Sequence, residues 1–155
     1  MKILLVWPGK TRNVNYRTLQ REYLEKIKPL AQVSLIETPE ARGLEEKWAD
    51  KILEKEASGL EKYVRDGYII CLSDAGKELN SKEFADLIES KGMNQGGQLV
   101  FLVGGFLGLS PRIMEKADLK LSLSRMTFSH ELARTILLEQ IYRALSLIRG
   151  YAYPK

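Results

Sequence analysis

The chain has 155 residues, enough for a single domain (1–155) that buries a core without disulfides or metals, and its composition is ordinary for a globular protein. The net charge of +4 permits a nucleic-acid partner but does not require one. The single cysteine, Cys71, excludes an internal disulfide. Because the chain has only one cysteine and one histidine, we expect no structural metal site.

The first half of the chain alternates between strand and helix patterns. KILLVW (2–7) predicts a short strand, too brief for a signal-peptide core, and no apolar run could span a bilayer. We therefore expect a cytoplasmic protein without a membrane partner. VNYRTLQREYLEKIKPL (14–30) has apolar residues at helical spacing and ends at Pro29, QVSLIET (32–38) alternates as strands do, and 44–65 predicts a helix.

The second half continues the alternation. YIICLS (68–73) and QLVFLV (98–103) are apolar enough for strands buried on both faces, and LKLSLS (119–124) predicts a further strand. Residues 74–80 predict a loop, and a long helix is expected from about His130 to Arg149.

Two shorter helices have recognisable start signals. Asn80 with Glu83 has the spacing of a capping box, which predicts a helix over SKEFADLIESK. Ser110 and Pro111 have the residue types of an N-cap and a first helical position.

Five strands, each followed by a helix, predict an α/β fold: a mostly parallel sheet with helices on both faces. Ligands of such sheets bind beyond the carboxyl ends of the strands. The loops 73–80, 104–110 and 124–129 lie there, so we expect the site in the second half of the chain.

The glycine-rich stretch 103–108, VGGFLG, is not a dinucleotide-binding fingerprint. Val103 stands where G-x-G-x-x-G requires its first glycine, and the stretch follows a late strand. By itself it predicts a tight turn in which two glycines supply positive φ.

Longer stretches carry a more specific signal. FLVGGFLGLS, LSLSRMTFSHELAR and LLEQIYRA, with the ending YAYPK, resemble the RlmH-type SPOUT methyltransferases. The resemblance covers the whole chain and is strongest over 99–155. It implies an α/β domain with a C-terminal trefoil knot, a homodimer, and S-adenosyl-L-methionine as cofactor. The implied activity is methylation of N3 of a pseudouridine in 23S rRNA.

The same resemblance implies a set of cofactor-binding residues in three loops: Leu72, Gly104, Gly105, Leu123, Ser124, Arg125, Met126, Thr127 and Phe128. Glycines would let the backbone approach the cofactor closely, and the larger apolar side chains would wall it. Plain core packing is the competing interpretation of the apolar residues. For the serines and the threonine, it is capping or bonding of the backbone.

For catalysis the resemblance implies His130, Arg143, Tyr153 and Lys155, and for RNA contacts it implies Arg134, Arg143 and Lys155. Each has a simpler interpretation. His130 could be a structural hydrogen-bonding residue, Arg143 could pair with Glu139 one turn earlier, and the tail could be a frayed terminus. The long last helix has more than one apolar face, which fits either a subunit contact or a central helix of the monomer.

The tail departs from the family pattern, in which histidine follows the tyrosine. Here Pro154 stands between Tyr153 and Lys155, and proline cannot handle a proton. A non-catalytic RNA-binding or ribosome-assembly factor that retains the fold is therefore an alternative hypothesis. A flavodoxin-like nucleotide binder is a third, against which the lack of an early phosphate loop argues.

Overall fold

The computed structural model describes residues 1–93 and 97–152, and its centre is one five-stranded parallel sheet. The strand order is β2-β1-β4-β3-β5. The strands are β1 (Lys2–Pro8), β2 (Gln32–Thr38), β3 (Tyr68–Glu78), β4 (Gln98–Leu102) and β5 (Leu119–Ser122). The predicted parallel α/β sheet is thus confirmed.

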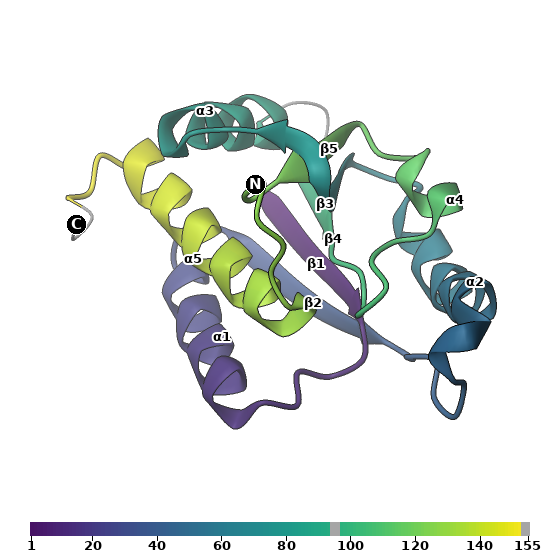
Figure 1. The fold of residues 1–155 in the computed structure, drawn as a ribbon. Coiled ribbons are helices and arrows are strands. Elements are labelled where there is room, and N and C mark those ends of the chain that lie inside the picture. Colours follow the sequence, from purple (N-terminus) through teal and green to yellow (C-terminus); the bar gives the residue numbers. More distant parts are fainter. Residues whose placement is uncertain (94–96, 153–155) are drawn as a thin grey trace.

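Helices cover both faces of this sheet (Figure 1). On one face, α5 (His130–Ile148) packs between α1 (Val14–Ile27) and α3 (Ser81–Gly92). The other face carries α2 (Ala49–Leu60) and the short α4 (Pro111–Met114). Single 3₁₀ turns, Glu46–Trp48 and Glu61–Tyr63, flank α2. No helix within the described parts of the chain is long and apolar enough to cross a membrane.

The central strand β4 shows why the sheet is buried on both faces. Its side chains alternate, so Leu99 and Phe101 pack in the core beneath α1, α3 and α5, while Val100 and Leu102 pack beneath α2 and α4. All four are fully buried. A continuous apolar run is what such a strand requires.

The local start signals are confirmed. Asn80 accepts from the backbone N–H of Glu83, whose carboxylate accepts from the Asn80 N–H, completing the capping box. The Ser110 hydroxyl accepts from the Ile113 N–H with Pro111 at the first helical position. Both helices therefore begin where side-chain chemistry starts them.

Several predicted bounds are wrong. The segment 74–80 is mostly strand, because β3 pairs with β5 on both sides of an irregularity between Leu72 and Lys77. The helix α1 ends at Ile27, ahead of Pro29, and the predicted helix 44–65 is shorter, with a 3₁₀ turn at either end. Pairing with β5 places the irregularity in β3. The local sequence of 74–80 does not indicate this pairing, so it predicts a loop.

Candidate functional site

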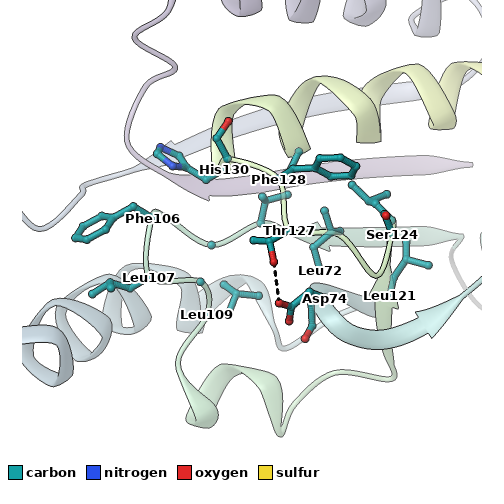
Figure 2. A pocket seen from close by; sticks show the side chains of 18 of the residues that line it. Leu72, Asp74, Phe106, Leu107, Leu109, Leu121, Ser124, Thr127, Phe128 and His130 are labelled. Carbon is teal, nitrogen blue, oxygen red and sulfur yellow. Dashed lines mark hydrogen bonds between the residues drawn. The ribbon is translucent and has the colours of Figure 1, made fainter. Parts of the chain in front are cut away.

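A cavity of about 720 Å³ lies at the carboxyl end of the sheet, within the size range of small-molecule sites. It is enclosed by the segments that follow β4 and β5, together with the middle of β3 (Figure 2). Of the nine predicted cofactor-binding residues, all but Arg125 line it. The structure thus brings together residues that lie up to 56 positions apart, from Leu72 to Phe128.

The wall formed by Gly104–Gly108 depends on close backbone approach. A Cβ built on Gly104 would lie 2.2 Å from the carbonyl carbon of Gly108, a contact that no side chain tolerates. Gly105 and Gly108 form an isolated bridge, in which the Gly108 N–H donates to the Gly105 oxygen at 3.0 Å. Of the three glycines only Gly108 has positive φ, +77°, so the expectation of two such glycines here is wrong as to number.

The opposite wall is held by hydrogen bonds between the segments after β3 and β5. The single O–H of Ser122 lies between the backbone oxygens of Asp74 and Ser124, at 3.3 and 2.9 Å, and can donate to either. The Thr127 hydroxyl donates to the Asp74 carboxylate at 3.4 Å (Figure 2). The Ser124 hydroxyl accepts from the Met126 N–H. These side chains form hydrogen bonds within the protein, which agrees with the alternative that the serines and the threonine bond the backbone.

His130 stands at the first position of α5, after the N-cap Ser129, and its side chain lines the cavity. Partial burial lowers the pKa of its imidazole below the ordinary value, and the nearby Arg134 cation acts in the same direction. The ring is therefore neutral near pH 7, and one of its nitrogens can accept a proton or a hydrogen bond.

Arg134 is buried, whereas a residue that contacts RNA phosphates must be exposed. Its side chain is 1% exposed and stacks on Trp7, with the guanidinium carbon 5.0 Å from the ring centroid. The guanidinium donates to the backbone oxygens of Pro8 and Gly9 and to the Thr11 hydroxyl. Burial lowers its pKa to about 10. Arg134 therefore fastens the loop after β1 to α5, and this placement does not support the predicted phosphate contact.

Arg143 forms the ion pair with Glu139 that their spacing predicts, at 2.7 Å, on a half-buried face of α5. It does not line the cavity, and its catalytic and RNA-binding roles stay predictions. Tyr153, Pro154 and Lys155 lie outside the described residues.

Sequence reasoning missed part of the cavity. Asp74, Phe106, Leu107 and Leu109 lie in or beside the loops expected to carry the site, so the carboxyl-end rule could have found them. Met114 on α4 and Ala133 on α5 also line the cavity. These two carry no local signal, because only helix packing brings them to it.

Solved methyltransferases share this fold. A probable methyltransferase from Bordetella pertussis Tohama I aligns with a TM-score of 0.59 at 14% identity, over 92% of this chain and 95% of that one. A ribosomal RNA small subunit methyltransferase E from Neisseria gonorrhoeae, bound to S-adenosyl methionine, aligns with a TM-score of 0.51 at 15% identity, over 96% and 66%. These alignments show a shared α/β fold, which here has its cavity at the carboxyl ends of the strands.

The sequence narrows this class further. A family model described as "Predicted SPOUT methyltransferase" matches residues 1–153. A ribosomal RNA large subunit methyltransferase H from Carboxydothermus hydrogenoformans is 40% identical over the full length of both chains. The chain belongs to the SPOUT methyltransferase family, which confirms the resemblance read from its motifs and decides against the flavodoxin-like binder.

Proposed function

We propose that this protein transfers a methyl group from S-adenosyl-L-methionine to N3 of a pseudouridine in 23S rRNA. The observation that carries the proposal is the cavity itself, which gathers eight of the nine residues predicted to bind the cofactor. The full-length relative named for methylation of large-subunit rRNA supports the substrate class. The pseudouridine and the N3 position rest on the motif resemblance.

The residues of the cavity fit this cofactor. Adenine binds between apolar walls and pairs with backbone groups, and Leu72, Leu109 and Leu121 supply such walls. Within 103–108 the backbone is bare at Gly104 and Gly105, which carry no side chains and line the cavity. We propose that this segment and 123–128 hold the cofactor.

When bound, the cofactor supplies an electrophilic methyl group on a positively charged sulfur. The chain's task is to align the target nitrogen and to let its proton leave. His130 is a candidate for handling that proton because its neutral imidazole lines the cavity. The target N3 lies on the pairing edge of its base, so the base must be unpaired or pulled from its stack.

We propose further that the protein acts in the cytoplasm as a homodimer whose contact includes the outer face of α5. Leu147 on this helix is 44% exposed, and Ile136 is only partly buried. A helix central to a monomer would have such residues buried. The C-terminal trefoil knot is likewise proposed from family membership.

Two measurements on one preparation test the function. Calorimetry with S-adenosylmethionine and S-adenosylhomocysteine measures cofactor binding, and labelled methyl transfer to 70S ribosomes from a strain lacking this gene, with mapping of the product, measures activity. We expect binding and a single labelled pseudouridine in 23S rRNA. Absence of binding refutes the enzyme. Binding without transfer, restored by Pro154→His, establishes the non-catalytic RNA-binding alternative.

A further inference from the structure

A second cavity, of about 470 Å³, adjoins the first. Gly105, Phe106 and His130 line both. Figure 2 shows Phe106 and His130 together at one end of the first cavity, away from Leu121 and Ser124. The remaining residues of the second cavity come from the loops after β1 and β2, from α2 and from α5: Pro8, Lys10, Arg12, Glu40, Ala41, Arg42, Gly43, Glu56 and Glu131. A molecule in this space would touch the residues at the edge of the cofactor site.

The unusual member of this cavity is Glu56, on the inner side of α2. It is 5% exposed, yet it takes part in no ion pair among residues 1–93 and 97–152. The backbone N–H of Ala41 favours its charged form. Burial raises the pKa of this carboxyl, and the neighbouring Glu40 carboxylate raises it further, against the opposing effect of the Arg134 cation.

Glu56 also lies at the junction of the two cavities. Its Oε2 is 3.1 Å from the position of a Cβ built on Gly105, so even a methyl group there would press on the carboxylate. A buried carboxylate without a directly paired cation is unfavourable for folding. Its position at the edge of a cavity indicates an acceptor kept for a ligand that brings its own N–H donor.

The surroundings indicate what kind of ligand this is. Three exposed cationic side chains line the cavity, those of Lys10, Arg12 and Arg42. Arg12 and Arg42 both pair with the Glu40 carboxylate, whereas Lys10 forms no ion pair within the described residues and suits a phosphate group. Phe106 is 57% exposed, and an exposed aromatic ring at a cavity edge suits stacking of an unpaired base. A cation, an aromatic ring and one buried acceptor together match a single unstacked nucleotide of RNA.

We propose that the second cavity binds the target nucleoside and that the Glu56 carboxylate accepts a hydrogen bond from N1–H of pseudouridine. This inference rests on the proposed function. In uridine, N1 carries the ribose and has no hydrogen, whereas in pseudouridine the ribose is on carbon and N1–H is a free donor. A contact to N1–H leaves N3, two ring positions away, open to the methyl donor. Glu56 is then the residue that distinguishes pseudouridine from uridine.

Glu56→Gln tests the acceptor with little change in side-chain size. Both oxygens of a carboxylate accept hydrogen bonds, so either can face the cavity. Glutamine has one oxygen, and its amide N–H₂, where it faces the nucleoside, opposes N1–H. Glu54→Gln is the matched control, since Glu54 lies on the same helix, is exposed, and lines neither cavity.

The assay is single-turnover methyl transfer to ribosomes carrying pseudouridine or, from a strain lacking the relevant pseudouridine synthase, uridine at the target. We expect wild type and Glu54→Gln to prefer pseudouridine. For Glu56→Gln we expect a loss of at least about tenfold on pseudouridine, little change on uridine, and unchanged affinity for S-adenosylhomocysteine. The melting temperature at neutral pH should not fall, because a neutral amide is easier to bury than a carboxylate.

Equal losses on both substrates, or no loss on pseudouridine, would overturn the inference. So would weaker S-adenosylhomocysteine binding, which would assign Glu56 to the cofactor. A wild type inactive on both ribosomes would overturn the proposed function itself. Should Glu56→Gln not fold, Phe106→Ala tests the cavity without touching the core: we expect KM for ribosomes to rise at least about fivefold, and an unchanged KM refutes the placement.

Discussion

Gly104→Ala tests whether the glycine-rich wall must be bare backbone. The added Cβ would lie 2.2 Å from the Gly108 carbonyl carbon and 2.4 Å from its oxygen. Unbonded carbons sit about 3.5–4.0 Å apart at their optimum, so the contact is short by more than about 1 Å. The neighbour is backbone rather than the end of a flexible side chain. The segment 104–108 must therefore move outward or into the cavity.

Overpacking of this kind costs about 1–3 kcal/mol of unfolding free energy. For a chain of this size that lowers the melting temperature by about 2–4 °C for each kcal/mol. The effect on function should be larger. A misplacement of about 1 Å in a binding wall can reduce rate by about a hundredfold, and we expect a loss of S-adenosylhomocysteine affinity of about ten- to a hundredfold.

Isothermal calorimetry measures the affinity for S-adenosylhomocysteine, and a thermal melt measures the melting temperature. Gly150→Ala is the control, since Gly150 has φ of +69° with nothing within 4 Å of a built Cβ. It carries backbone strain of about 1–2 kcal/mol at most, far from the cavity, and should bind normally. A Gly104→Ala protein that binds as tightly as wild type and melts at the same temperature would refute the reasoning.

Three further predictions concern the supports of the site. Arg134→Met leaves the buried oxygens of Pro8 and Gly9 without their donor and should destabilise the chain by about 1–3 kcal/mol in urea unfolding, and a change below about 0.5 kcal/mol would contradict the anchoring role. Since the folded-state pKa of His130 lies below the ordinary 6.5, unfolding binds a proton, so stability should fall as pH drops from about 6.5 through that lower pKa. His130→Gln should remove this part of the dependence in melts across pH 5–8, and identical wild-type and variant profiles would show the assignment to be wrong. Asn80→Ala removes the cap of α3 and should cost about 0.5–2 kcal/mol while leaving S-adenosylhomocysteine binding intact, whereas a loss of binding would mean that α3 supports the cavity.

Local chemistry explains why much of the fold was predictable. Continuous apolar runs such as 99–102 indicate strands buried on both faces. Asn80 with Glu83, and Ser110 with Ile113, start their helices with hydrogen bonds between neighbours in sequence. The loops that line the cavity were predictable for a related reason: parallel strands end at one edge, and the motifs follow those strands. Arg125 does not line the cavity, and its cofactor-binding role stays a prediction.

The sequence by itself determined the parallel α/β sheet, the edge at which the site lies, and the family. Only the tertiary structure decided the role of Arg134, since a charged residue beside a site motif has no local sign that α5 will bury it against Trp7. The same holds for Glu56. It lies 49 residues before Gly105, and the packing of α2 against the sheet, which no periodicity records, brings its carboxylate to the junction of two cavities.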